Sequence, residues 1–196
     1  MKTEENSHEH QVQEQLIRAG KELAGKGLVS GRSGNISIRL MTGNILISAT
    51  HTFLGMLELD DLIEIDFDGR AVGEGKAPSS ERFLHMEIYK ARPDVHAIVH
   101  THSVHASAYA FLDRPLRSVN YENDLVLGEV PIVSYAQPGT IEFARSACEG
   151  LGNKAAALLQ RHGTVAVGED IFDALAVAEL LEDVAKVNYL IDTLSK

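Results

Sequence analysis

The sequence predicts an α/β protein: one domain spanning residues 1–196, built as an α/β/α layered sandwich around a central, largely antiparallel sheet. Short segments in which apolar and polar residues alternate are typical of half-buried strands, and longer segments with apolar residues at helical spacing separate them. In the first half, turn signals between consecutive strand-like segments indicate an antiparallel meander. Helices between groups of strands favour a layered sheet over a helix bundle or a β-sandwich.

The first half is predicted to hold one helix and then the meander. Residues 1–9 are polar and predict a frayed start, whereas the apolar spacing over 10–26 predicts an amphipathic helix that covers the sheet. Small residues over 30–35 predict a loop. Alternation and turn dipeptides then predict strands at 36–40, 45–48 and 62–67, with turns at 42–44 and 68–69 and a further extended piece at 71–73.

The second half is predicted to alternate strands with helices. A helix follows Pro78-Ser79-Ser80-Glu81 and stops near Pro93, because serines favour helix starts and proline disfavours helix for the residue before it. Asp170 is predicted to cap a long final helix with one apolar face. The other predicted elements are a strand from 97, a helix over 103–111, a strand at 131–135, a helix over 140–151 and paired strands at 155–159 and 164–168.

Composition excludes several classes of function. The formal net charge of −10 argues against a nucleic-acid-binding surface, which needs clustered Lys and Arg. The single cysteine, Cys148, forms no intrachain disulfide, and no N-terminal apolar segment predicts a signal peptide or a membrane span. We therefore expect a cytoplasmic protein without a membrane partner. An anionic small molecule stays possible, because backbone amides and hydroxyls bind phosphate locally.

A pair of histidines at the end of an apolar strand is the first candidate site. His100 and His102 are spaced i, i+2, so a strand aims both imidazoles at one face. His162 follows another apolar run, at residues 155–159, and would complete a three-imidazole metal site with an open position. Packing or hydrogen bonding explains histidines at strand ends equally well. His105 is a further candidate, as a ligand or as a residue that supports one.

Two other segments suit an anion and a proton-transfer group. Ser79, Ser80 and Glu81 fit a simple helix cap, with the acid complementing the helix dipole. They also fit a helix start that receives a phosphate while Glu81 transfers protons beside a metal. Gly34 and Asn35 lie in a loop that is either a plain turn or an anion-binding nest.

The order and spacing of these motifs resemble the class II aldolase/adducin family, particularly its fuculose-phosphate aldolase branch. The resemblance covers nearly the whole chain. It rests on four motifs in matching order, namely Gly31-x-Ser33-Gly34-Asn35-Ile36-Ser37, Pro78-Ser79-Ser80-Glu81, Val99-His100-Thr101-His102-Ser103 and His162-Gly163.

The resemblance implies a role for each matching residue. His100, His102 and His162 match three histidines that bind Zn²⁺, or another divalent transition metal, and Glu81 matches the catalytic acid/base. Tyr121 matches an active-site tyrosine of the aldolases. The positions that match phosphate-binding residues are Gly34, Asn35, Thr50, Ser79 and Ser80. The family also implies a homotetramer with active sites at subunit interfaces and a phosphorylated sugar as substrate.

Two departures bear on the substrate. Residues 48–55 read Ser-Ala-Thr-His-Thr-Phe-Leu-Gly where the family has a small turn, which indicates a remodelled side of the phosphate pocket around Thr50. The chain also ends at Lys196 without the longer tail that supplies an aromatic residue in some relatives.

The resulting hypothesis is reversible aldol cleavage of a ketose 1-phosphate, of the fuculose, rhamnulose or ribulose type, to dihydroxyacetone phosphate and an aldehyde. Ribulose-phosphate 4-epimerisation uses related chemistry, but that branch commonly has Asp where this chain has Glu81. Decarboxylation of a phosphorylated 3-oxo sugar acid is a third reaction for the same site. A noncatalytic, adducin-like domain is the alternative from another class, and bound zinc in the purified protein would separate it from the enzymes.

Overall fold

The computed structural model describes the backbone of residues 2–195 and the side chains of residues 9–195. Seven strands form one sheet in the order β3-β2-β1-β4-β7-β6-β5. Only β5 and β6 pair in parallel, so the predicted largely antiparallel sheet is confirmed. The strands are β1 (Asn35–Arg39), β2 (Ile45–Ser48), β3 (Leu62–Ile65), β4 (Ala97–Thr101), β5 (Ile132–Val133), β6 (Ala156–Leu159) and β7 (Gly163–Gly168).

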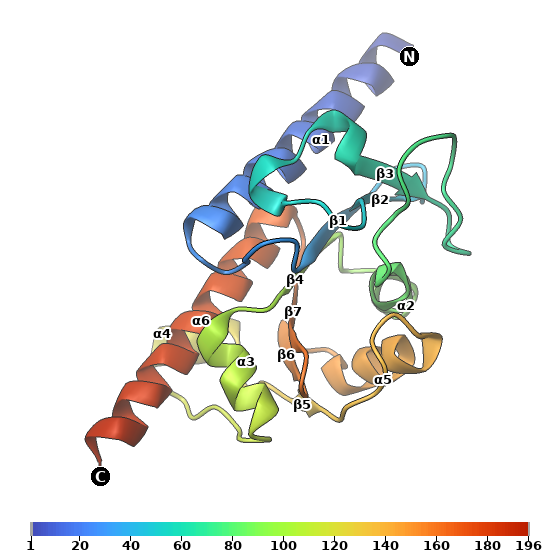
Figure 1. Ribbon diagram of the computed structural model, residues 1–196. Coiled ribbons are helices and arrows are strands. Elements are labelled where there is room, and N and C mark those ends of the chain that lie inside the picture. Colours follow the sequence, from blue (N-terminus) through green and yellow to red (C-terminus); the bar gives the residue numbers. More distant parts are fainter. Residues whose placement is uncertain (1, 196) are drawn as a thin grey trace.

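Helices cover both faces of this sheet, as the sequence predicts (Figure 1). The helices α1 (Lys2–Gly25), α3 (Val104–Phe111) and α6 (Ile171–Leu194) pack on one face and share a buried apolar core with it. The helices α2 (Arg82–Ala91) and α5 (Ile141–Leu151) pack on the other face around a second core. Short pieces complete the chain, namely the 3-10 turns η1 (Leu54–Met56) and η2 (Leu59–Asp61) and the helix α4 (Tyr121–Val126).

Strand alternation decides which residues of the central strands face α2 and α5. Val99 belongs to the α1/α6 core and Ile98 to the α2/α5 core, so His100 points to the α2/α5 face with Ile98. In β1, Ile36 lies in the α1/α6 core, and Asn35 therefore shares the face of His100. Asn35 and His100 are direct partners in the β1/β4 register. The pairing of β1 with β4 thus places Asn35 beside His100, on the face of the sheet that α2 and α5 cover.

Two expectations need correction, and one helix was not predicted. The frayed start at residues 1–9 is wrong for the residues that the structure describes, because α1 already begins at Lys2. The extended piece at 71–73 contributes only one isolated bridge, between Ala71 and Ile65, so the meander ends with β3. The sequence pattern also missed α4, whose six residues are too short for a periodic signal. Among the described residues, no helix combines the length and apolarity that crossing a bilayer requires.

Candidate active site

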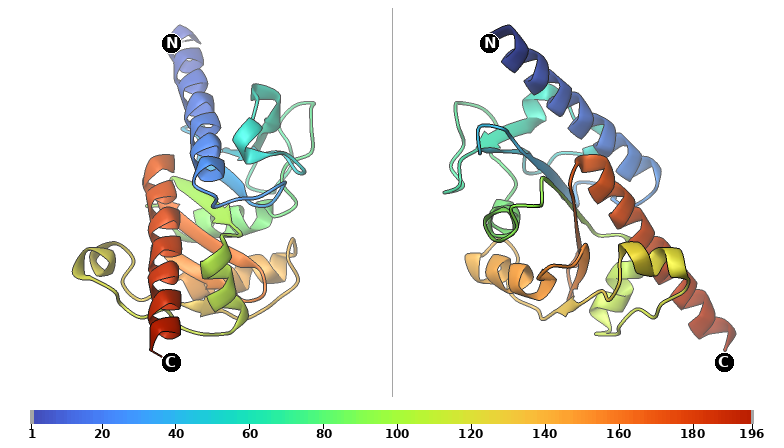
Figure 2. Two further views of the ribbon diagram at one scale, coloured as in Figure 1. Left: turned by 60° about the vertical axis from the view of Figure 1, so that its left-hand side comes forward. Right: turned by 180° about the vertical axis from the view of Figure 1, so that it is seen from behind.

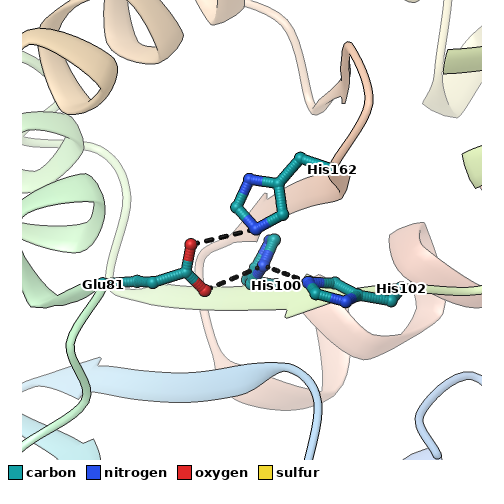
Figure 3. A group of neighbouring side chains, drawn as sticks. All are labelled: Glu81, His100, His102 and His162. Atoms are coloured by element: carbon teal, nitrogen blue, oxygen red, sulfur yellow. Dashed lines mark hydrogen bonds and ion pairs between the residues drawn. The ribbon is translucent and has the colours of Figure 1, made fainter. Parts of the chain in front are cut away.

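Four side chains converge at the C-terminal end of β4, the middle strand of the sheet (Figure 3). One potential ligand atom from each of Glu81, His100, His102 and His162 lies within 4.8 Å of the other three. They come from three separate segments: the start of α2, the end of β4 and the turn between β6 and β7. The structure therefore brings together the three predicted metal ligands and the predicted acid/base.

His100 is held rigidly because it belongs to the central strand. Its side chain is fully buried, and its Nδ1 lies 2.7 Å from the backbone oxygen of Thr164, which only accepts hydrogen bonds. The Nδ1 proton therefore points at Thr164, and Nε2 faces the cluster at 3.0 Å from Nε2 of His102. A histidine oriented in this way by a backbone carbonyl has the form in which imidazole binds metals.

His162 reaches the cluster through a tight turn. Arg161, just before it, adopts a left-handed conformation with φ of 56°, which few residues other than glycine take up. Gly163 follows, and a Cβ atom there would lie 2.3 Å from the backbone oxygen of Thr101 and 2.8 Å from Cδ2 of His102. The absent side chain at Gly163 is what allows β7 to pass this close to the β4 histidines.

Glu81 stands at the N-cap position of α2 without capping the helix through its side chain. Its carboxylate turns to the cluster instead, with Oε2 3.1 Å from Nε2 of His100 and Oε1 3.0 Å from Nε2 of His162. The cap contact is made two residues earlier, where Ser79 Oγ accepts a hydrogen bond from the Glu81 backbone N–H at 3.2 Å. The helix start is thus satisfied by Ser79, which leaves the carboxylate free for chemistry.

The electrostatics of the cluster favour a bound cation. Burial alone would raise the pKa of Glu81, but attraction to His100 and His162 outweighs it and holds the pKa well below its usual range. Burial, together with repulsion from the other two imidazoles, lowers the pKa of His102 to about 4, and burial also lowers the pKa of His162. His100 differs, because attraction to Glu81 outweighs its burial and raises its pKa. The cluster thus joins a carboxylate to two imidazoles whose pKa is lowered, His102 and His162, and to one whose pKa is raised, His100.

The donor set fits a divalent metal. The Oε1 atom of Glu81 and the Nδ1 atom of His162 are buried without a hydrogen bond, and the short distance from Oε1 to His162 lacks hydrogen-bond geometry. Tetrahedral zinc with nitrogen ligands separates those ligand atoms by roughly 3.3 Å, close to the spacing of the His100 and His102 nitrogens. Neutral imidazoles and a carboxylate are ligands that zinc, copper, iron and nickel accept.

The predicted phosphate-binding positions surround the same site. Gly34 adopts a φ of +80°, and a Cβ atom there would lie 2.7 Å from the backbone oxygen of His100. Ser79 is buried and Ser80 is exposed at the start of α2. Thr50 donates its backbone N–H to the oxygen of Ala77, just before these serines, so the 48–55 loop lies beside the helix start.

The remodelled 48–55 loop borders a hollow of about 310 Å³. Thr50 lines it together with Lys76, whose amino group pairs with Asp61 at 2.7 Å. The other lining residues are His51, Thr52, Phe53 and Met56. The loop that departs from the family pattern therefore supplies four of the residues that line this hollow, Thr50, His51, Thr52 and Phe53.

Two predicted residues lie outside the cluster. Tyr121 is 75% exposed at the start of α4 and is not among the four converging side chains. His105 places Nδ1 2.8 Å from Oε1 of Glu182, a buried carboxylate of α6 that also accepts hydrogen bonds from the backbone N–H groups of His105 and Ala106. His105 thus helps to fix α3 behind the site and does not join the cluster.

One cluster of buried polar side chains, which reaches Glu81 through Asn35, was not predicted from the sequence. It consists of Ser37, His85 and Tyr89, together with the side chain of Asn35. The signals were present: Asn35 and Ser37 are spaced i, i+2 on one strand, and Glu81, His85 and Tyr89 are spaced i, i+4 along one helix. Nothing in the sequence shows that the two faces meet.

Comparison with known proteins agrees with this geometry. Residues 14–189 match the family model described as Class II Aldolase and Adducin N-terminal domain. The chain is 34% identical over 181 residues to an L-fuculose phosphate aldolase of Methanococcus maripaludis, covering 92% of this chain and 97% of that one. It is 32% identical over 198 residues to a 3-oxo-tetronate 4-phosphate decarboxylase of Haemophilus influenzae, covering 92% of both.

A solved structure agrees as well. The fold superposes on that of an L-fuculose 1-phosphate aldolase with a TM-score of 0.89 at 29% identity, covering 95% of this chain and 88% of that one. Family model, relatives and fold coincide with the cluster of three histidines and one glutamate. The chain belongs to the class II aldolase and adducin family, as a metal-dependent enzyme.

Proposed function

We propose that the protein is a zinc-dependent aldolase that reversibly cleaves a ketose 1-phosphate to dihydroxyacetone phosphate and an aldehyde. The observation that carries this proposal is the convergence of Glu81, His100, His102 and His162 beside the Ser79-Ser80 helix start. L-fuculose phosphate aldolases among the relatives support this substrate class. Fuculose, rhamnulose and ribulose 1-phosphates are the sugars to test first.

His100, His102 and His162 would hold the metal through their Nε2 atoms. A divalent metal held by neutral imidazoles supplies Lewis-acid stabilisation of the negative charge that develops on substrate oxygens. Breaking the C3–C4 bond of the ketose leaves an electron pair at C3, while the C4 hydroxyl loses its proton as the aldehyde forms. Glu81 is the partly buried carboxylate beside this position, and we assign it the proton transfers at C3 or at a hydroxyl.

Substrate positioning falls to the segments around the cluster. Amides at Gly34 and Asn35 and the hydroxyls of Ser79 and Ser80 would bind the phosphate, and the N-terminal end of α2 favours its negative charge. Anchoring the phosphate places the reacting carbons between Glu81 and the histidines. Thr50 would add a contact from the 48–55 loop.

We also propose a homotetramer in which Tyr121 completes the site of a neighbouring subunit, takes up the C4 hydroxyl proton in cleavage and returns it to the aldehyde oxygen in the condensation direction. Tyr121 is exposed and lies on α4, away from its own chain's cluster. Large apolar side chains are also exposed on α4 and on the helices α3 and α6 and the residue after α3: Phe111, Leu112, Leu125 and Leu190. Because Cys148 is a free thiol, we place the protein in a reducing cytoplasm.

A second candidate is decarboxylation of a phosphorylated 3-oxo sugar acid. It is favoured by the similarity to a 3-oxo-tetronate 4-phosphate decarboxylase and by the altered 48–55 loop beside the phosphate position. Epimerisation of a ribulose phosphate is less favoured, because Glu81 stands where that branch commonly has Asp.

The test is a substrate panel with metal-replete protein, containing ketose 1-phosphates, ketose 5-phosphates and a phosphorylated 3-oxo acid. Release of dihydroxyacetone phosphate from a ketose 1-phosphate supports the aldolase. A new pentulose phosphate without fragmentation identifies an epimerase, and carbon dioxide release from the 3-oxo acid identifies a decarboxylase. Stoichiometric zinc without turnover of any member of the panel would contradict the proposal of catalysis.

A further inference from the structure

A continuous row of hydrogen bonds runs from the interior of the α2/α5 core to Glu81. The Asn35 side chain donates from Nδ2 to Oε2 of Glu81 at 2.9 Å, and its Oδ1 lies 2.5 Å from Nε2 of His85. The other ring nitrogen of His85, Nδ1, lies 2.6 Å from Ser37 Oγ, which in turn lies 2.8 Å from the Tyr89 hydroxyl. Asn35, Ser37 and His85 are buried, as is Tyr89.

The donor and acceptor properties of each group determine the direction of the hydrogen bonds in this row. The carboxylate of Glu81 only accepts, so the amide N–H of Asn35 faces it and the amide oxygen faces His85. That oxygen also only accepts, so Nε2 of His85 carries a proton. His85 is completely buried, which lowers its pKa to about 3 and keeps the ring neutral. A neutral ring with its proton on Nε2 has a bare Nδ1, which accepts from the Ser37 hydroxyl.

The last member closes the row in the same direction. Because Ser37 gives its proton to His85, its oxygen can only accept from the Tyr89 hydroxyl at 2.8 Å, and the backbone oxygens of Ser37 and His96 are further acceptors for that hydroxyl at 3.1 and 3.4 Å. Burial raises the pKa of Tyr89, so this hydroxyl stays protonated. The donors of Ser37, His85 and Asn35 therefore all point toward Glu81, and hydrogen bonds aligned in this way strengthen one another. Fixing one tautomer at His85 fixes the orientation of the Asn35 amide.

We propose that His85 is a positioning residue, which through its Nε2 proton locks the Asn35 amide so that Asn35 holds Oε2 of Glu81 in place for proton transfer. The inference rests on the proposed function only for the role of Glu81. It gives the Asn35 side chain a task distinct from phosphate binding. A rotated amide would turn its oxygen to the Glu81 carboxylate, and two acceptors in contact repel.

The first experiment reads the tautomer directly in the unaltered, zinc-loaded protein. Ring-nitrogen chemical shifts from ¹⁵N NMR of histidine-labelled protein distinguish the two neutral tautomers from the imidazolium. The His85 signals are assigned by their loss in the variant His85→Gln. We expect a neutral ring with the proton on Nε2 from pH 6 to pH 8. A proton on Nδ1, or an imidazolium, would overturn the proposal whatever the enzyme's activity.

The second experiment compares two substitutions that keep different parts of the ring. A glutamine amide reaches the place of Nε2, so His85→Gln keeps the donor to Asn35. An asparagine amide reaches only the place of Nδ1, so His85→Asn keeps the contact to Ser37 and loses Asn35. The matched control is His96→Asn, at an exposed histidine just before β4. Zinc content and thermal unfolding are measured for all three.

We expect His85→Asn to lower kcat about ten- to a hundred-fold, the effect of losing one hydrogen bond to a charged group, with KM and zinc content unchanged. His85→Gln should stay within a few-fold of the unaltered protein. Equal losses of kcat in His85→Asn and His85→Gln, or no loss of kcat in either variant, would contradict the positioning role of His85. If the unaltered protein cleaves no sugar phosphate, the proposed function fails, whereas the tautomer measurement still decides the state of His85.

Discussion

At the scale of single residues, Glu81 combines two properties that rarely coexist. It is a partly buried carboxylate, and it has imidazoles on one side and the Asn35 amide on the other. Its position at the helix start would normally assign it to capping, but Ser79 makes the contact to the backbone instead. A side chain released from a structural task and surrounded by oriented donors is suited to moving a proton.

Glu81→Gln is therefore expected to keep the zinc that we propose the three imidazoles hold, while lowering kcat about 10²- to 10⁴-fold, because the amide cannot exchange a proton. Metal analysis and steady-state kinetics check this. Glu87→Gln on the same helix is the matched control, since Glu87 pairs with Lys90 and Arg145 away from the cluster. A fully active Glu81→Gln enzyme would contradict the assigned role.

Site residues could be predicted from the sequence where they belong to a pattern within one strand or one motif, and not where they depend on contacts between distant segments. His100 and His102 follow from strand periodicity alone, and His162 required the order of several motifs. The link from Glu81 through Asn35 to His85 joins a strand and a helix that are 46 to 50 residues apart. Such contacts depend on how β1 and α2 pack, which local spacing does not encode.

At the scale of elements, the beginning of α2 joins the two halves of the proposed chemistry. Ser79 and Ser80 precede the helix, and Glu81 occupies its N-cap position. The backbone N–H groups of Arg82 and Leu84 already donate to the backbone oxygens of Ser79 and Glu81, so an anion here would be favoured by the helix dipole and the serine hydroxyls. The proposed proton transfer and the proposed phosphate binding would therefore share one helix start.

The Ser79→Ala/Ser80→Ala double variant should mainly raise KM for the phosphorylated substrate, on the order of ten-fold for each lost contact to the phosphate. Ser80→Ala alone separates binding from capping, since only Ser79 accepts the Glu81 N–H. Inhibition by inorganic phosphate should weaken in parallel. A KM that does not change in the double variant would argue against a phosphate at this helix start.

The close approach of β7 to β4 provides a test at the same scale. Gly163→Ala places a methyl group against the Thr101 oxygen and the His102 ring, so β7 must shift. We expect a destabilisation of about 1–3 kcal/mol and weaker zinc binding. Gly25→Ala is the matched control, because a Cβ atom there meets nothing within 4 Å. Thermal unfolding and zinc titration check both variants; equal zinc affinity in the two would contradict this role of Gly163.

Elements with strong periodicity were predictable, and weakly patterned ones were not. The long helix that starts after Asp170 and the hairpin of β1 and β2 agree with the sequence prediction. The segment at 71–73 carries the same turn signal before it, yet it pairs only once, because the chain leaves the sheet toward Lys76 and α2. Turn residues specify a reversal of the chain and not the number of pairs that follow it.

At the scale of the whole molecule, the site lies where the middle of the sheet meets the helices of one face. The neighbouring strands β1, β4 and β7 supply or support it. Figure 2 shows α2 and α5 on one face of the sheet, with α1 and α6 on the other. The opposite layer, with α1, α3 and α6, forms the larger support. A polar cluster around one carboxylate, Asp192, ties the end of α6 to α3 and to the segment after it, which stabilises this layer.

The pH dependence of stability should reveal this cluster. Asp192 accepts a hydrogen bond from Tyr109 and pairs with Arg114 and Arg117, which holds the pKa of Asp192 below its usual range. A lowered pKa in the folded state stabilises the fold above the ordinary carboxyl pKa, and this stability is lost as pH falls through the lowered value. Asp192→Asn should thus lower Tm at pH 7 and converge with the unaltered protein in acid.

Thermal unfolding from pH 7 to pH 3 measures that difference, with Asp60→Asn at an exposed aspartate as the control. The Asp192 effect should shrink only below about pH 4, the usual carboxyl range. A difference in Tm that stays constant over the whole pH range would show that Asp192 acts through packing and not through its charge.

The most direct test of the central claim is a zinc titration of metal-stripped protein with L-fuculose 1-phosphate present, following dihydroxyacetone phosphate. The three-imidazole site predicts no release without metal and a rate that rises linearly to a plateau at one zinc per chain. A rate that is independent of added metal, or zinc bound at one per chain without release from this or any other ketose 1-phosphate, would contradict it.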